Sequence, residues 1–365
     1  MYPVLRVASL CLAIAATGCN AIGPRALQSG RINYNEAIAQ TWNEQLLRNL
    51  VRLKYRDTLV FLEVSSVSTQ YSVSYSAGAS GSFIGAGAND ELGLDTGVGF
   101  SERPTVIYTP LQGQEFVTQL LSPIPLDALI LLSQSGWSIE RVLRICAQRM
   151  NELDNAASAS GPTPALAPVF EEFHKAARLM RTLQINGGLR ALLEPSDTDE
   201  DAGAALVFRF SPGATKSEEA QALRRLLGVP EGTEALYVRD GWYVGDADRL
   251  AVQTRSMLGV MHFLSNAVES PQAHRDAGWV VTTRNEDGGE FDWGDAATKD
   301  LLKISWQNDR PRDAFVATKY RGGWFYIDNA DLHSKTTFGL LTYLFYLQAG
   351  EIKSFGPTLT LPVGQ

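Results

Sequence analysis

The spacing of hydrophobic residues changes sharply near residue 59. Before it, apolar residues recur every three or four positions and predict one amphipathic helix over about 34–56; they are Tyr34, Ile38, Trp42, Leu46, Leu50 and Leu53. After it, apolar residues alternate with small polar ones, first from Val67 to Ala79 and again from Leu92 to Phe100. A period of two predicts strands with one apolar face. Asn89-Asp90 supplies a turn between them, so the pattern predicts one long β-hairpin.

Charge is scarce in this predicted hairpin. No Lys or Arg occurs from Val64 to Ser101, and the acids there lie at or near the turn: Asp90, Glu91 and Asp95. Two interpretations stay open. A glycine-rich surface flap or a half-buried soluble hairpin would alternate in the same way. In the second interpretation, residues 67–106 form a membrane hairpin, and each protomer contributes one hairpin to a pore shared by an oligomer.

Helical spacing returns after the hairpin. One helix is predicted from Pro125 to about residue 133, and a second from Ser138 to about residue 150, with Cys146 buried in it. Together with the first helix and the hairpin, this αα unit makes a predicted domain over residues 34–153.

Two polar segments separate that domain from the C-terminal part. Residues 154–168 are mostly small and predict a linker, and residues 169–203 predict a helix followed by an acidic linker. Over 204–270 the predicted order is strand, helix, strand, strand, helix, and strands precede a last helix over 271–365. The predicted fold class is α+β: an N-terminal helix and long β-hairpin with an αα unit, then C-terminal β-α-β-β-α subdomains.

An internal repeat links the two C-terminal subdomains. The motif Arg-x-Gly-Trp-aromatic-x-x-Asp occurs at 239–246 and again, 82 residues later, at 321–328. Each copy is followed by Leu, Thr and Leu at four-residue intervals, which predicts a hairpin leading into a helix, over about 247–268 in the first copy. The tryptophans are expected to pack strand against helix and the aspartates to cap the helix; these residues are Trp242, Trp324, Asp246 and Asp328.

The N-terminus has the pattern of a secretory signal. Arg6 precedes an apolar run too short to span a bilayer, and the small residues Thr17 and Gly18 lead to Cys19. This arrangement resembles the lipobox of bacterial lipoproteins, although Ala16 stands where family members usually carry Leu. The resemblance implies a signal peptide over 1–18, a lipid on Cys19 and a lipidated tether over 19–33. In the family, Asn20 after the cysteine implies sorting to the outer membrane.

Little in the chain predicts catalytic chemistry. A formal net charge of −8 argues against a nucleic-acid partner, and no phosphate-binding glycine loop or nucleophile elbow occurs. The four histidines lack a second ligand at zinc-site spacing. Of these, His174 is expected on a helix surface and His274 in a loop. The acidic segment 285–295 predicts a hairpin turn; the alternative is calcium binding through Asp287, Glu290 and Asp292. No cofactor is predicted.

Several stretches resemble a family of uncharacterised bacterial lipoproteins, and the resemblance brings no activity with it. They lie at 44–53, 61–67, 255–259 and 324–328. In addition, the element order over 205–268 is similar to that of the ring-building domains of envelope secretion assemblies. That likeness concerns topology only.

These features together predict a non-enzymatic lipoprotein, lipid-anchored in the outer membrane and facing the periplasm, that serves as a structural component of an envelope assembly. Exposure on the cell surface is the alternative to the periplasmic orientation. The expected partners of the lipoprotein are the membrane, other envelope proteins or further copies of itself. The sharper version is an oligomeric ring or pore built with residues 67–106. A monomeric periplasmic binding or adaptor lipoprotein is the alternative, and an uncharacterised hydrolase is the third.

Overall fold

The computed structural model describes residues 32–81, 92–194, 205–242 and 248–349, which form a mixed α+β protein. The chain divides into two compact units. The hairpin unit is Val60–Leu111, and the larger unit comprises Met1–Leu59 and Gln112–Gln365. Among the described residues, no helix combines the length and apolar character that a bilayer crossing requires.

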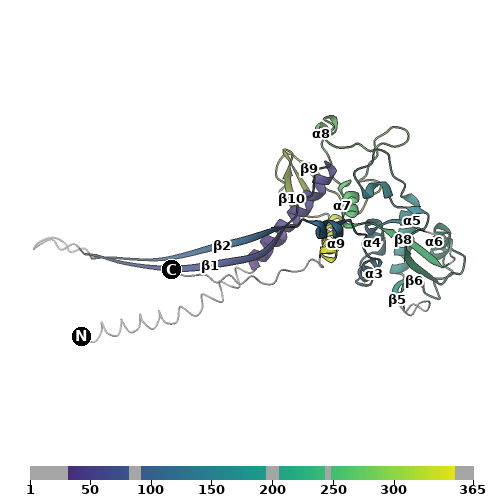
Figure 1. Cartoon of the computed structure of the whole chain (residues 1–365), viewed down its shortest axis with the longest axis horizontal. Helices are drawn as coiled ribbons and strands as arrows, with labels where there is room; N and C mark the ends of the chain where they lie inside the picture. The colour runs from purple at the N-terminus through teal and green to yellow at the C-terminus, as the bar shows by residue number, and fades with distance from the viewer. Residues whose placement is uncertain (1–31, 82–91, 195–204, 243–247, 350–365) are drawn as a thin grey trace, which may run out of the picture. The chain divides into compact units, whose positions relative to one another are not determined.

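The hairpin unit consists of two long antiparallel strands, β1 (Leu62–Gly81) and β2 (Leu92–Pro110). Figure 1 shows them side by side along their whole length. The register is continuous except for a bulge between Val64 and Ser66. At the open end, the amide of Leu111 donates to the carbonyl of Phe61 at 3.0 Å. The predicted hairpin is thus confirmed.

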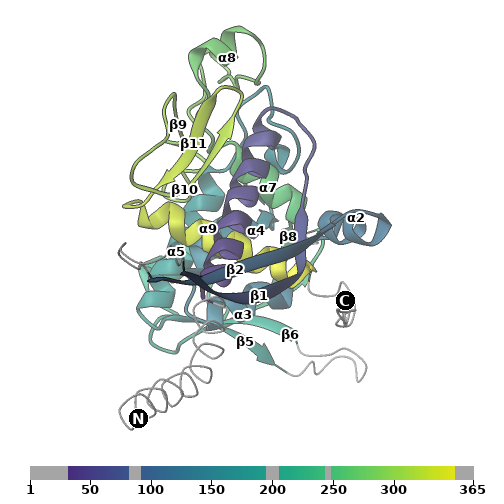
Figure 2. The ribbon, with the colours of Figure 1, turned by 90° about the vertical axis from the view of Figure 1, so that its left-hand side faces the viewer.

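The larger unit begins with a helix over residues 32–54, called here the N-terminal helix. Its predicted apolar stripe is confirmed where the helix is most buried, at Leu46, Leu50 and Leu53, and Leu47 and Val51 widen the buried face. Figure 2 shows this helix, in purple, beside α9 and the strands β9, β10 and β11.

A six-stranded sheet with the order β4-β3-β8-β7-β6-β5 forms one layer of the larger unit. The strands are β3 (Ala147–Met150), β4 (Leu153–Asp154), β5 (Leu189–Glu194), β6 (Ala205–Phe210), β7 (Ala235–Asp240) and β8 (Arg249–Thr254). Neighbours are antiparallel except β7 and β8, which are parallel.

Four helices pack around this sheet: α3 (Leu126–Gln134), α4 (Ile139–Cys146), α5 (Glu171–Ile185) and α6 (Glu218–Leu227). Helices α3 and α5 contact its strands, and α4 and α6 pack against α5. Two serines fix helix starts, because Ser138 accepts a hydrogen bond from the Arg141 amide and Ser217 accepts one from the Ala220 amide.

The rest of the larger unit carries a second, three-stranded sheet with the order β10-β11-β9. Its strands are β9 (Ser305–Gln307), β10 (Ala314–Tyr320) and β11 (Gly323–Asp328). The remaining helices are α2 (Gln114–Leu121), the short 3-10 turn η1 (Ala157–Ser160), α7 (Met257–Ser265), α8 (Gln272–Asp276) and α9 (Leu332–Ala349). Strands before the last helix were predicted, and β11 is the central one, which pairs with both others.

The predicted repeat is only partly reflected in the fold. The first three elements, strand, helix and strand, are confirmed over 205–240, yet the next strand does not form the predicted hairpin with β7, and the helix expected over 247–268 is wrong at its start. Residues 249–254 form strand β8, parallel to β7, whereas the second copy has the antiparallel pair β10–β11. Leu250 lies in β8, whereas its counterpart in the second copy, Leu332, lies in helix α9.

Other expectations need correction as well. The small-residue segment predicted as a linker is packed inside the larger unit, since Asn155, Ala156 and Ala159 are completely buried. The small side chains of this segment allow close packing and do not make it a linker. The helix predicted to run to residue 150 ends at Cys146, and its last four residues form β3. The acidic segment expected as a domain boundary lies largely outside the described residues.

Candidate functional site

The register of the hairpin brings the two apolar series of the sequence opposite each other. Val73 pairs with Phe100, Tyr75 with Val98, and Ala79 with Leu94. Directly paired positions of an antiparallel ladder lie on the same face of the ribbon. The backbone register therefore agrees with the single apolar face that the alternation predicts.

The other series pairs small and polar residues. Ser74 pairs with Gly99, Ser76 with Gly97, and Ser72 with Ser101. Asp95, an acid inside the strands, belongs to this series because it pairs with Gly78. The hairpin thus has one series of positions suited to an apolar environment and one suited to a polar environment.

Charged residues also divide the hairpin into two halves. Glu102 and Arg103 pair with Tyr71 and Gln70 about midway along the ribbon. Beyond them, each strand continues for about ten residues to the turn, which matches the 9–11 residues that a tilted strand needs to cross a bilayer. The half near the open end is different, with solvent-exposed apolar side chains at Ile107 and Tyr108.

The strands have a further property that bears on function: their outer edges. Among the described residues, β1 and β2 form a sheet of two strands and pair with no third strand. Two-stranded hairpins alone are marginally stable in water, and long unpaired edges invite pairing with another chain. A ribbon of 20 and 19 residues is a long one to leave without lateral neighbours.

The site residues predicted from the sequence fall elsewhere. Cys19 and Asp246 lie outside the described residues. Trp242 does not pack strand against helix: it is 69 % exposed, with the guanidinium of Arg149 over its ring at 4.7 Å. Trp324 is half-buried beneath the Arg310 guanidinium at 5.3 Å. The buried aromatic of the motif is its neighbour Phe325.

Asp328 is not the cap of α9. Its Oδ1 accepts a hydrogen bond from the Ala330 amide at 2.7 Å, which forms a turn after β11. The cap is Asp331, which immediately precedes the helix and accepts from the amide and the hydroxyl of Ser334. Asp331 stands directly before the apolar helix α9, and this position was the sequence signal for the cap. The repeat motif led to the prediction of Asp328 instead.

The acidic segment uses its carboxylates locally. Asp287 accepts from the Gly289 amide, Asp292 accepts from the amides of Gly294 and Asp295, and Glu290 lies 4.0 Å from Arg275. The hydrogen bonds stabilise local turns, and the contact between Glu290 and Arg275 is one long ion pair. In the described part of the chain, no three His, Cys, Asp or Glu side chains are grouped so that they could hold a metal ion.

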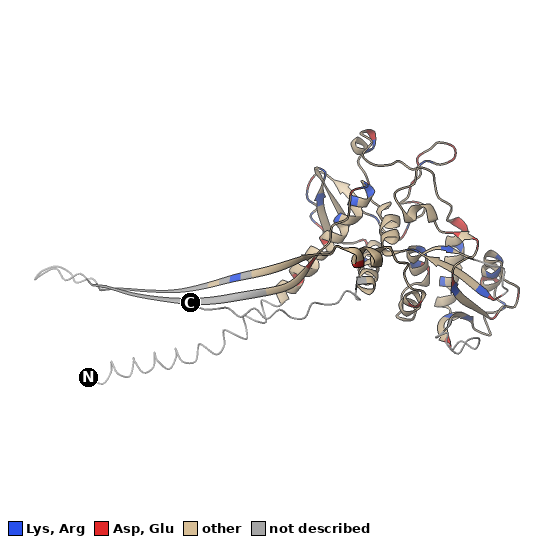
Figure 3. Ribbon diagram, viewed as in Figure 1, with Lys and Arg blue, Asp and Glu red and all other residues tan. Residues whose placement is uncertain are grey.

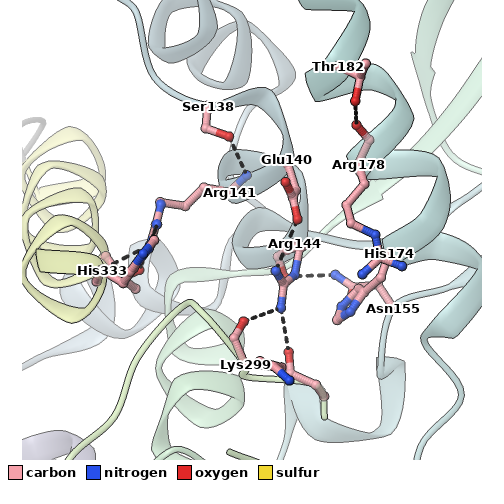
Figure 4. A network of polar contacts seen from close by, with 12 residues as sticks. Ser138, Glu140, Arg141, Arg144, Asn155, His174, Arg178, Thr182, Lys299 and His333 are labelled. Atoms are coloured by element: carbon pink, nitrogen blue, oxygen red, sulfur yellow. Dashed lines mark hydrogen bonds and ion pairs between the residues drawn. The ribbon is translucent and has the colours of Figure 1, made fainter. Parts of the chain in front are cut away.

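A buried polar network, not recognised from the sequence, joins α4 and α5 to the loop before β9 (Figure 4). Arg144 donates to Glu140 at 3.3 Å and to the carbonyl of Lys299 at 2.7 Å. His174 was expected on a surface but is buried, and its Nε2 lies 3.2 Å from Asn155 Oδ1. Burial, assisted by nearby arginines, lowers the pKa of His174 to about 2, so the ring is neutral.

Cys146 ends α4 beside this network and is fully buried. Burial raises the pKa of its thiol to about 12, which removes the thiolate needed for nucleophilic chemistry at neutral pH. The cluster as a whole is therefore structural. Figure 3 shows the other charged residues of the larger unit distributed over its helices, strands and loops.

No protein-family model, curated protein or solved structure matched this chain. The hairpin unit remains the feature whose geometry points most directly to a function, because its register, charge distribution and open edges all concern the same two strands.

Proposed function

We propose that this protein is a lipid-anchored outer-membrane lipoprotein that assembles into a homo-oligomeric ring, with residues 67–106 of each copy contributing one membrane hairpin to a shared pore. The observation that carries the proposal is the β1–β2 register, which aligns the apolar positions of both strands in one series and the Ser, Gly and Asp positions in the other.

The open edges support self-assembly. In lipid, every backbone amide and carbonyl needs an internal partner, so a two-stranded ribbon cannot cross a bilayer alone. Pairing the free edge of β1 with the free edge of β2 in a neighbouring copy would satisfy both. Closing the ring removes the last edges, which is the condition for a stable membrane-spanning sheet.

The residue types support the orientation of the hairpin. The Val, Tyr and Phe series would contact lipid, and the Ser and Gly series would line the pore, where Asp95 remains hydrated. The charge-poor half has the length of the hydrocarbon layer, and Glu102 and Arg103 would then lie at its boundary.

The N-terminal lipid fits the same location. A lipid on Cys19 holds the chain at one membrane surface, which raises the local concentration of hairpins and restricts their orientation. No catalytic step is needed in this role. The periplasm-facing body would present surfaces to other envelope proteins.

Neighbouring residues of β1 allow a matched test. Val73→Arg places a charge in the apolar series, which costs about 2–4 kcal/mol at a bilayer midplane, whereas Ser74→Arg places the same charge in the polar series. The full chain would be extracted in detergent, sized by mass photometry and reconstituted in planar bilayers. We expect rings and conductance for the natural chain and for Ser74→Arg, and loss of conductance for Val73→Arg.

Two outcomes contradict the proposal. Natural protein that is monomeric in detergent and does not conduct favours the monomeric binding or adaptor lipoprotein. Equal behaviour of Val73→Arg and Ser74→Arg means that the two series do not face different environments.

A further inference from the structure

The larger unit contains a cavity of about 760 Å³ that the proposed function does not use. It lies where the end of the N-terminal helix, the segment 266–270, helix α8, the loop 290–303 and the start of α9 come together. Its volume is in the range of small-molecule sites, about 300–1,000 Å³. The lining is largely polar, which suits a charged or hydroxylated ligand better than an apolar one.

Lys54 is the most unusual group in this lining. It ends the N-terminal helix, and the residue is only 6 % exposed. Within the described residues its ammonium has no hydrogen-bond or ion-pair partner. Burial, and to a lesser extent the charge of Arg275, lowers its pKa to about 8, while Glu290 opposes the effect. A buried cation without a partner is costly unless an anion compensates it.

Arg275 places a second cation on the same cavity. Its guanidinium is fixed by the carbonyl of Ser270 at 2.8 Å and by the side-chain oxygen of Gln272 at 2.6 Å. These neutral contacts orient the group and leave its charge uncompensated. The nearest acid, Glu290, lies at 4.0 Å and is 57 % exposed, so it screens Arg275 weakly.

Five further acids line the cavity: Glu269, Asp292, Asp295, Asp300 and Asp331. Glu269 pairs with Lys303 at 3.3 Å, and Asp292 and Asp331 accept hydrogen bonds from backbone amides. Of all the acids in the lining, Glu290 is the one whose charge acts on Lys54. Lys54 and Arg275, two of the four cations in the lining, therefore share one nearby carboxylate, Glu290, and that side chain is 57 % exposed.

Asn266 adds a complementary feature. Its amide nitrogen donates to the carbonyls of His262 and Phe263 at 3.1 and 3.2 Å. Its Oδ1 is buried and has no hydrogen-bond partner among the described residues. An unsatisfied buried acceptor is destabilising, so a donor from a bound molecule would be favourable here.

We propose that this cavity binds an oxyanion group, carboxylate or phosphate, of a polar ligand, with Lys54 and Arg275 holding the oxyanion and Asn266 accepting a hydrogen bond from the same molecule. Such a group would compensate the buried ammonium, and charge-assisted hydrogen bonds to it would be the main source of affinity. The site does not depend on the hairpin or on oligomerisation.

Inorganic phosphate and acetate serve as separate probes. Each would be titrated into the purified full chain in Tris chloride at constant ionic strength, with the melting temperature and calorimetric binding as readouts. A bound anion raises the melting temperature by mass action. Stabilisation by phosphate alone assigns a phosphate site, stabilisation by acetate alone assigns a carboxylate site, and a response to both supports the oxyanion site in general.

Three variants make the test specific. Lys54→Met should fold and lose the anion response. Arg275→Gln, a change at a partly exposed residue, should weaken binding about tenfold or more, because one charge-assisted contact is lost. Lys303→Met is the matched control, since this lysine lines the same cavity but is paired and 65 % exposed. No response to either probe, or an unchanged response in Lys54→Met and Arg275→Gln, overturns the proposal.

Discussion

Arg321 forms an ion pair with Asp57, with Nη2 and Oδ2 3.0 Å apart. The contact joins the turn between β10 and β11 to the segment that follows the N-terminal helix. Tyr320 donates its hydroxyl to the same carboxylate oxygen. The Arg321 guanidinium also lies over the rings of Tyr55 at 5.0 Å and Trp279 at 5.4 Å. The Arg321 guanidinium therefore connects three segments that are far apart in the sequence.

Replacing Arg321 should weaken this junction measurably. Arg321→Ala removes a half-exposed ion pair and the cation–π contacts, and we expect it to lower the free energy of unfolding by about 1–2 kcal/mol. Urea denaturation monitored by circular dichroism would measure the loss. Arg310→Ala is the control, because that arginine contacts one ring, Trp324. Equal losses in the two variants would contradict the importance of the junction.

The same carboxylate predicts a pH effect. Burial pushes the pKa of Asp57 upward, but the hydrogen bonds from Tyr320 and Arg321 outweigh it, and the pKa is lowered. A carboxyl whose folded pKa is lowered contributes stability above its ordinary pKa, and this stability is lost as the pH falls through the folded value. Asp57→Asn should therefore be less stable than the natural chain at pH 6, with a gap that shrinks below pH about 4. A constant gap would exclude this cause.

The repeat motif led to a wrong secondary-structure prediction in its first copy. Leu250, Thr254 and Leu258 are four residues apart, and this interval fits a helix face but also the same face of a strand, because four is a multiple of two. The structure puts the first two in β8 and the third in α7. Pairing with β3 and β7 decides the strand, and such long-range partners leave no signal in the motif itself.

The hairpin was predictable for the opposite reason. Alternation continues over many residues in both strands, and a register shifted by one residue would place the apolar series opposite the polar series. The buried groups of the larger unit, such as His174 and Lys54, were not predictable. His174 packs against neighbours such as Asn155 and Phe170, and Lys54 lies against the segments 266–270 and 290–303. Polar side chains at such positions look like ordinary surface residues in the sequence.

Gly323 supplies a test of the turn that positions Arg321. A Cβ at this residue would collide with the indole of Trp306. Gly323→Ala should therefore cost about 1–3 kcal/mol through displacement of the ring or the strand. Gly339→Ala in helix α9 is the matched control, since nothing lies within 4 Å of its Cβ position, and it should stabilise by about 0.5–1 kcal/mol. Denaturation midpoints in urea would show opposite shifts, and shifts of the same sign would disprove the collision.

Arg255 should be essential for stability. It is buried and donates to three carbonyls around the end of α4, those of Arg144, Ile145 and Ala147, and to Ser160 and Asn155. Arg255→Met leaves several buried acceptors unsatisfied and should cost about 3–5 kcal/mol. Arg225→Met at an exposed position should change the free energy of unfolding by less than about 0.5 kcal/mol. Calorimetric unfolding would reveal the difference, and a mild effect of Arg255→Met would refute its capping role.

Lys54 predicts a pH dependence of stability in the alkaline range. Its folded pKa of about 8 lies below the ordinary value of 10.5, so the folded chain binds fewer protons than the unfolded chain between these values. Stability contributed by this residue should rise with pH across that window. Lys54→Met should exceed the natural chain by about 3 kcal/mol at pH 7 in anion-free buffer, and the gap should close near pH 10.5. A gap that widens with pH would contradict an uncompensated ammonium.

Deleting most of the hairpin should leave the larger unit folded. Removal of residues 66–106, with a short Gly-Ser turn in their place, takes away only β1–β2 pairing, because both six- and three-stranded sheets consist of strands from the larger unit. Phe61, which is buried, stays in the chain. We expect the shortened chain to unfold cooperatively, with a melting temperature within a few degrees of the natural chain and no detergent-resistant ring. Loss of cooperative unfolding would show that the hairpin supports the core. Rings that persist without the hairpin would show that the assembly contacts lie in the larger unit.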